Sequence, residues 1–72
     1  MPRYVIYLAG FEYMDEVAMA IERMGGAVIS YGKISPYLVV ELPTGLESMV
    51  MGLRGVRGIM PTGRFRTMQI NF

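Results

Sequence analysis

The arrangement of apolar residues along this chain constrains its fold more than any other feature of the sequence. Four short runs are rich in β-branched and aromatic residues and end at glycine or proline, as strands do: residues 4–8, 27–31, 37–42 and 56–60. After the first and third runs, apolar residues recur at steps of three and four, which is typical of amphipathic helices. This order predicts an α+β fold, a ferredoxin-like βαββαβ sandwich whose antiparallel sheet carries two helices on one face.

Both helical segments carry signals for where they begin and end. In the first, Gly25-Gly26 stops the pattern, because glycine readily adopts the left-handed conformation that often follows a helix. In the second, Thr44 and Glu47 have the spacing of a capping box, so we expect their side chains to bond backbone donors at the helix start. We expect these residues to face the core: Met14, Val17, Ala18, Ile21 and Met24 in the first helix, and Leu46, Met49, Val50 and Leu53 in the second.

The length of 72 residues leaves room for one small domain. We expect residues 1–60 to form this domain and residues 61–72 to form a basic C-terminal tail that could add an edge strand. The charges are unevenly distributed, because residues 1–53 hold three cations and all six acidic residues, whereas residues 54–72 hold four arginines and no acid. A basic end of this kind suits nucleic acid or an acidic protein surface.

The residue types that most often perform catalysis or bind metals are missing. The sequence contains no cysteine and no histidine, which excludes disulfides, thiolate sites and the most frequent general base. The acidic residues near and within the first helical segment have the spacing of a solvated helix face: Glu12, Asp15, Glu16 and Glu22. We therefore expect a non-catalytic binding protein that uses no cofactor and no metal.

Three features bear on where such a protein works. The longest uncharged stretch, residues 24–32, has nine residues and is too short to cross a membrane, and the first residues lack the apolar core of a signal peptide. We therefore expect no membrane contact and a cytoplasmic location. The only asparagine and glutamine, Asn71 and Gln69, together with the lack of cysteine, favour a thermophilic source, whereas eight methionines favour the opposite.

The side of the predicted sheet without helices is unusually apolar. Its expected residues are Val5, Tyr7, Ile29, Tyr31, Tyr37 and Val39, with Ile59 as a further candidate. Apolar patches of this size rarely stay exposed to solvent on a monomer. We therefore expect a protein partner, which could be a second copy of the chain in a homodimer.

The arginines near the C-terminus suggest an alternative function. Arg54, Arg57, Arg64 and Arg66, with Phe65 between the last two, could contact phosphates and stack on bases. The alternative is therefore a small homodimeric protein that binds DNA or RNA through this segment. The pI of about 8.1 is below the value typical of nucleic-acid-binding domains, and the sheet lacks the signature of an RRM.

The order of several short segments resembles a known family. The segments are Tyr4-Val5-Ile6-Tyr7, Gly10-Phe11, Met24-Gly25-Gly26-Ala27-Val28, Val39-Val40-Glu41-Leu42-Pro43, the helix over residues 46–53, and Gly55-Val56 with Ile59. Over residues 4–60 the chain is similar to the propeptide-like inhibitors of subtilisin-type proteases, the subtilase prodomain family. Met60, Pro61 and Thr62 depart from the pattern, because they stand where relatives carry acids that cap helices of the protease.

This resemblance implies the same βαββαβ fold and a specific way of binding. The helix-free side of the sheet would dock on the protease, with Tyr7, Tyr31, Tyr37 and Val39 as docking residues. The tail would lie along the active-site cleft through Met68, Gln69, Ile70, Asn71 and Phe72. The leading hypothesis is therefore a stand-alone inhibitor or chaperone of a subtilisin-type serine protease.

Overall fold

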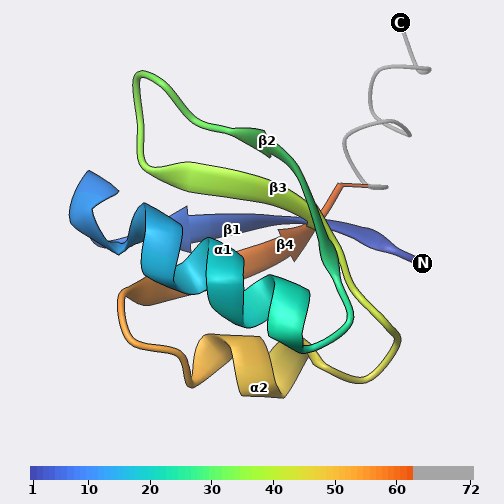
Figure 1. Cartoon of the computed structure of the whole chain (residues 1–72). Helices are drawn as coiled ribbons and strands as arrows, with labels where there is room; N and C mark the ends of the chain where they lie inside the picture. Colours follow the sequence, from blue (N-terminus) through green and yellow to red (C-terminus); the bar gives the residue numbers. More distant parts are fainter. Residues whose placement is uncertain (63–72) are drawn as a thin grey trace, which may run out of the picture.

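The computed structural model describes residues 1–62 of the chain. Its elements are β1 (Arg3–Leu8), a 3-10 turn η1 (Phe11–Tyr13), α1 (Met14–Arg23), β2 (Ala27–Tyr31), β3 (Tyr37–Glu41), α2 (Glu47–Met51) and β4 (Val56–Pro61). The strands form one antiparallel sheet in the order β2-β3-β1-β4, and both helices lie on the same side of it (Figure 1). The α+β prediction is therefore confirmed, and the arrangement is compatible with a ferredoxin-like fold. The predicted tail strand lies outside the described residues.

The core lies between the helices and one face of the sheet. Alternate residues along β1 and β3 point to this face and are at most 5% exposed, together with three residues of α1, one of α2 and the residue that follows β3. The buried residues are Tyr4, Ile6, Leu8, Val17, Ala18, Ile21, Leu38, Val40, Leu42 and Val50. Burial of this contiguous set is the main stabilising contribution to the domain.

The end of α1 agrees with the sequence prediction. Gly25 has a φ of +90°, and its N–H donates to the carbonyl of Glu22. The N–H of Gly26 reaches the carbonyl of Ile21 at 3.0 Å, which closes the helix in the manner of a glycine C-cap. The chain can then turn directly into β2.

The start of α2 differs from the prediction. Leu46 occupies the N-cap position without a side-chain cap, so the predicted capping box of Thr44 and Glu47 is wrong. Gly45 has a φ of +91° and follows Thr44, which lies two residues before the N-cap position. Met49 was expected in the core but is 56% exposed, because this helix has five residues and buries only Val50.

Candidate functional site

The side of the sheet turned away from the helices, called the open face below, is organised in rows across the strands. It consists of Arg3, Val5 and Tyr7 from β1, Tyr37, Val39 and Glu41 from β3, Ala27 and Ser30 from β2, and Gly58 and Met60 from β4. The residues of β1 and β3 in this set alternate with the core residues of the same strands. The residues of β2 and β4 in this set pair with them across the sheet. No helix of residues 1–62 covers them (Figure 1).

The centre of the open face is apolar. Val5 lies between Val39 and Met60 in one row, and Tyr7 lies between Tyr37 and Gly58 in the next. Tyr7 is 40% exposed and Met60 is 38% exposed, while the two valines and Tyr37 are partly buried by their neighbours. Cross-strand contacts of this kind hold the side chains in fixed positions, so the surface is ordered before it meets a partner.

Gly58 explains how Tyr7 lies on the sheet. A Cβ atom added to Gly58 would lie 3.9 Å from Cδ2 of Tyr7, an ordinary van der Waals distance, so the edge of the tyrosine ring lies beside the glycine. An aromatic side chain beside a glycine of the neighbouring strand helps to shield backbone that would otherwise be open to water. The ring is thereby positioned by β4 as well as by its own strand.

One end of the open face carries an ion pair. The guanidinium of Arg3 donates a hydrogen bond to the carboxylate of Glu41 at 3.0 Å, and the two residues are direct partners in the ladder. Both side chains are partly exposed, so the pair adds little stability. The charges of the open face therefore balance at one end and leave its centre uncharged.

Two residues predicted for the helix-free side, Tyr31 and Ile59, lie elsewhere. The register of β2 shifts between Val28 and Ser30, so Ile29 is the extra residue of a bulge and Tyr31 pairs with Leu38, a core residue. The extra residue reverses the alternation, so Ser30 pairs with Val39 and lies on the open face. The prediction for Tyr31 is therefore wrong, whereas Ile29, as the extra residue, has no partner in the ladder. The side chains of Ile29 and Tyr31 are 46% and 49% exposed.

Ile59 was also expected on the helix-free side. It pairs with Ile6 and packs against the core, so this prediction is wrong. Its neighbour Met60 faces the other way and completes the row of Val5 and Val39. Sequence analysis missed Met60 because the strand was expected to end there and its register with β1 was unknown.

The arginine cluster is not assembled within residues 1–62. Arg54 follows α2, and its guanidinium lies over the ring of Tyr13, 5.7 Å from the centroid, in a cation–π contact. Arg57 is exposed on β4, while Arg64, Phe65 and Arg66 lie outside the described residues. The nucleic-acid alternative therefore depends on residues beyond this part of the structure.

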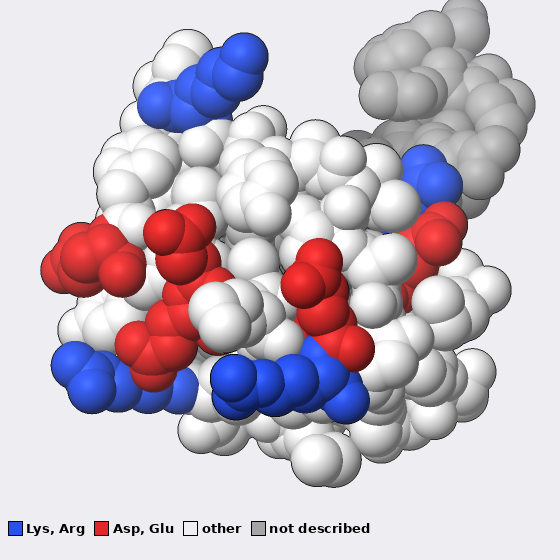
Figure 2. All heavy atoms as spheres, in the orientation of Figure 1, with Lys and Arg blue, Asp and Glu red and all other residues white. Residues whose placement is uncertain are grey.

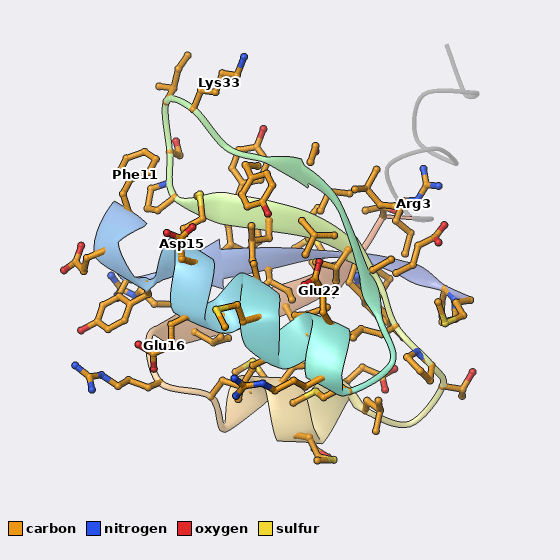
Figure 3. The ribbon with its side chains drawn as sticks, viewed as in Figure 1. Arg3, Phe11, Asp15, Glu16, Glu22 and Lys33 are labelled. Carbon is orange, nitrogen blue, oxygen red and sulfur yellow. The ribbon has the colours of Figure 1, made fainter. Side chains whose placement is uncertain are left out.

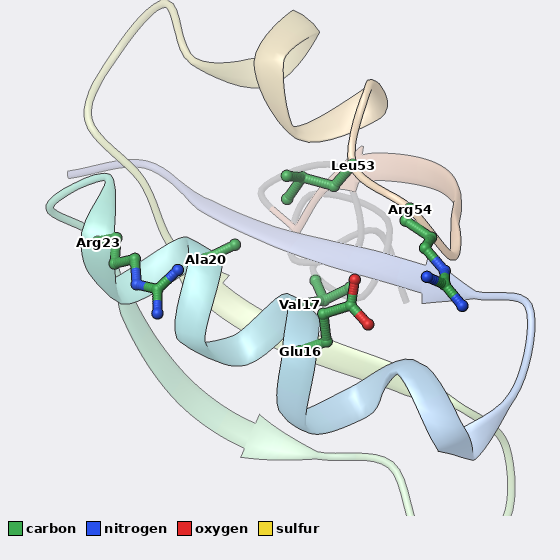
Figure 4. A pocket seen from close by; sticks show the side chains of 6 residues that line it. All are labelled: Glu16, Val17, Ala20, Arg23, Leu53 and Arg54. Atoms are coloured by element: carbon green, nitrogen blue, oxygen red, sulfur yellow. The ribbon is translucent and has the colours of Figure 1, made fainter.

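A hollow of about 180 Å³ lies beside Arg54 on the helix side. Figure 4 shows Arg23 and Arg54 at its two ends, with Glu16 between them on α1 and Leu53 across from the helix; Val17 and Ala20 complete the lining. A carboxylate between two guanidinium groups weakens their attraction for a phosphate. The hollow is therefore a poor candidate for a phosphate site.

Three of the six acidic residues lie on α1, away from the open face. Figure 2 shows acidic groups spread across this view of the molecule, and Figure 3 shows Asp15, Glu16 and Glu22 projecting from the helix. Within residues 1–62 no three metal-ligating side chains stand close enough together to hold an ion. In the same part of the chain, no helix has the length and apolar character needed to cross a membrane.

One hydrogen bond between β1 and α2 was not anticipated from the sequence. The hydroxyl of Tyr4, a core residue, donates to the carboxylate of Glu47 at 2.6 Å. This bond lowers the pKa of Glu47, and backbone amide donors lower it further. The same bond, together with burial and the nearby negative charge, raises the pKa of Tyr4. The pair lies on the core side, where it joins the start of α2 to the sheet.

Comparisons with known proteins do not assign this chain to a family. No protein-family model, no curated protein and no solved structure matches it. Its function must therefore be inferred from its own residues and their arrangement.

Proposed function

We propose that this protein is a non-catalytic protein-binding domain of ferredoxin-like fold, and that its open face docks on a partner protein. The observation that carries the proposal is the apolar centre of that face, where Val5, Tyr7, Val39 and Met60 are neighbours and no helix of the described chain covers them. Contiguous apolar surface of this kind is rare on proteins that act alone. Tyrosine and methionine are also among the residues enriched in protein interfaces.

The order of the face supports this use. The side chains at its centre are fixed by cross-strand neighbours, so binding would cost little conformational entropy. The Arg3–Glu41 pair lies at one end of the apolar centre. This resembles the polar rim that surrounds the apolar core of a protein interface. A surface that is both apolar and ordered suits a specific protein contact.

As the partner we propose a subtilisin-type serine protease, for which this chain would act as a stand-alone inhibitor or chaperone. The resemblance over residues 4–60 motivates this choice, and the strand order β2-β3-β1-β4 with both helices on one side is consistent with it. The N–H and hydroxyl of Thr62 both donate to the carbonyl of Arg3, at 3.0 and 3.3 Å. Thr62, the last residue that the structure describes, is therefore held at the Arg3 end of the sheet. Under this proposal residues 67–72 would occupy a cleft of the bound protease.

An inhibition assay tests the proposal directly. The full chain and a version ending at residue 66 are added to a panel of subtilisin-type proteases, and the rate of peptide hydrolysis is measured. We expect the full chain to inhibit at least one of them and the shortened chain to lose most of this inhibition. If neither form slows any protease of the panel, the proposal is wrong.

Two methionine variants show whether the open face makes the contact. Met60 on the open face is 38% exposed and Met49 on α2 is 56% exposed. We expect Met60→Lys to weaken inhibition about tenfold, because a charge in the apolar centre would be desolvated on docking. Met49→Lys is the matched control and should leave inhibition unchanged. Equal effects of the two substitutions would contradict docking through the open face.

The nucleic-acid alternative predicts a different response to salt. Phosphate contacts by arginine release counterions, so such binding falls steeply between about 50 and 200 mM salt. Docking through an apolar surface should change little over the same range. Salt-sensitive binding to DNA or RNA, without inhibition of any protease, would favour the alternative.

A further inference from the structure

The loop between β2 and β3 carries the most exposed large apolar side chain of residues 1–62. Ile34, at its tip, is 96% exposed. Figure 1 shows this loop extending beyond the sheet, and Figure 3 places Lys33 at its tip, at the opposite end of the sheet from Arg3. An isoleucine in this position gains almost nothing from the fold of its own domain.

The loop is held in place at its base. The N–H of Gly32 donates to the carbonyl of Tyr37 at 2.8 Å, and the N–H of Leu8 donates to the carbonyl of Pro36 at 2.9 Å. A Cβ atom on Gly32 would lie 2.7 Å from Cε2 of Tyr37, so the tyrosine ring packs directly on the glycine. Both ends of the loop that presents Ile34 are thus fixed, which lowers the entropic cost of binding through it.

The loop is continuous with the open face. A shallow hollow of about 460 Å³ is lined by Tyr31, Lys33, Ile34, Ser35 and Tyr37. Tyr37 belongs to the open face as well, where it pairs with Tyr7. A partner seated on the open face would therefore reach the loop without a gap in the contact surface.

The charge of the loop indicates the chemistry of what it meets. Lys33 is exposed, and the only ion pair within residues 1–62 joins Arg3 to Glu41, at the other end of the sheet. The loop therefore offers one apolar side chain beside one unpaired positive charge. An apolar pocket with a carboxylate at its rim is complementary to both.

We propose that the β2–β3 loop is a second contact element for the protein partner of the open face: Ile34 enters an apolar pocket of the partner, and Lys33 pairs with a carboxylate at the rim. This inference rests on the proposed function, because it concerns the same partner. A protein pocket fits better than a lipid surface, since stable membrane binding requires several basic residues or a larger apolar face. The loop supplies only one basic residue, Lys33, and one exposed apolar residue, Ile34.

Calorimetric titration against a subtilisin-type protease, inactivated by replacement of its nucleophilic serine, tests the inference. We expect Ile34→Ser to weaken binding about tenfold, as for an interface anchor. Ile34→Leu should change affinity by less than about threefold, because it keeps the apolar volume. Lys33→Glu should weaken binding more at low salt than at high salt. Met19→Ser, a change at a 52% exposed residue of α1, is the control and should have no effect.

The outcomes separate this inference from the proposed function. If the full chain binds and Met60→Lys weakens binding but Ile34→Ser does not, the loop is not a contact element while docking by the open face stands. If the full chain binds no protease of the panel, both proposals fail together. Binding to vesicles of anionic phospholipid is measured as well. If the chain binds these vesicles and Ile34→Ser abolishes the binding, the loop contacts a lipid surface and the proposed protein pocket is wrong.

Discussion

The covered face and the open face of the sheet are built from neighbouring residues of the same strands, and both are apolar. On β1, Ile6 is fully buried under the helices, whereas the adjacent Tyr7 is 40% exposed on the other side. On β3, Leu38 and Val40 are fully buried, whereas Val39 between them is only partly so. The comparison shows that apolar character alone does not separate residues that stabilise a small domain from residues available for binding. The difference comes from what covers each face.

The two faces should therefore respond differently to the loss of side-chain volume. We expect Ile6→Ala to destabilise the domain by about 2–5 kcal/mol, because it leaves a cavity among buried neighbours. For 72 residues the total free energy of unfolding is roughly 4–11 kcal/mol, so this variant would be close to unfolding. Val5→Ala on the open face should cost about 1 kcal/mol or less. Urea unfolding followed by circular dichroism measures both values.

Equal losses of stability in these two variants would contradict the comparison. They would mean that the open face is already covered in the free protein, for example by a second copy of the chain. Measuring the Val5→Ala variant at two protein concentrations distinguishes the cases, because the stability of a dimer depends on concentration. A monomer gives the same midpoint at both.

Much of the fold could be predicted from the sequence, because the dominant signals are local. Glycine and proline mark the ends of the strands, and the end of α1 at Gly25-Gly26 follows from the freedom of glycine at positive φ. The capping of α2 was mispredicted because Thr44 and Glu47 have the spacing of a capping box, while the side chain of Glu47 bonds a residue that is distant in sequence. Glu47 instead accepts the hydroxyl of Tyr4, 43 residues away in sequence, which no local pattern reveals.

The open face could be predicted only in part, for a similar reason. The alternation along β1 and β3 correctly placed Val5, Tyr7, Tyr37 and Val39 on one side of the sheet. The bulge in β2 leaves no mark in the sequence Ala27–Tyr31, so Tyr31 was placed on the wrong side. A single extra residue reverses the facing of every residue after it, which makes site prediction on strands sensitive to register.

The two faces should also differ in their tolerance of added volume. Gly55 has a φ of +88°, and a Cβ atom there would collide with the ring of Tyr13 on the helix side. We expect Gly55→Ala to cost about 1–2 kcal/mol for the backbone conformation and about 1–3 kcal/mol more for displacing the ring. Gly58→Ala on the open face should be neutral or stabilising by up to about 1 kcal/mol, because its Cβ would meet Tyr7 at 3.9 Å, an ordinary contact. Thermal unfolding of the two variants measures the difference.

Gly45→Ala separates the two contributions at Gly55. Gly45 has a φ of +91°, but an added Cβ would have no neighbour within 4 Å. This variant should therefore show the backbone cost alone, and the excess in Gly55→Ala reports the collision with Tyr13. If the two variants lose the same stability, Tyr13 moves aside freely and the helix side is less tightly packed than the structure indicates.

The smallest expected effect concerns the pH dependence of stability, which should belong to the covered side. Because the hydrogen bond from Tyr4 lowers the pKa of Glu47 below its ordinary 4.5, the folded state gains stability above this pH and loses it as the pH falls through the lowered pKa. At the alkaline end, the raised pKa of Tyr4 means that stability is lost as the pH rises beyond 10.0. Tyr4→Phe removes the bond and should flatten the acid limb of a plot of melting temperature against pH. Tyr31→Phe is the control, because the Tyr31 hydroxyl makes no hydrogen bond among residues 1–62, and it should leave the slope of the acid limb unchanged. Equal slopes in the two variants would show that the Tyr4–Glu47 bond does not form in solution.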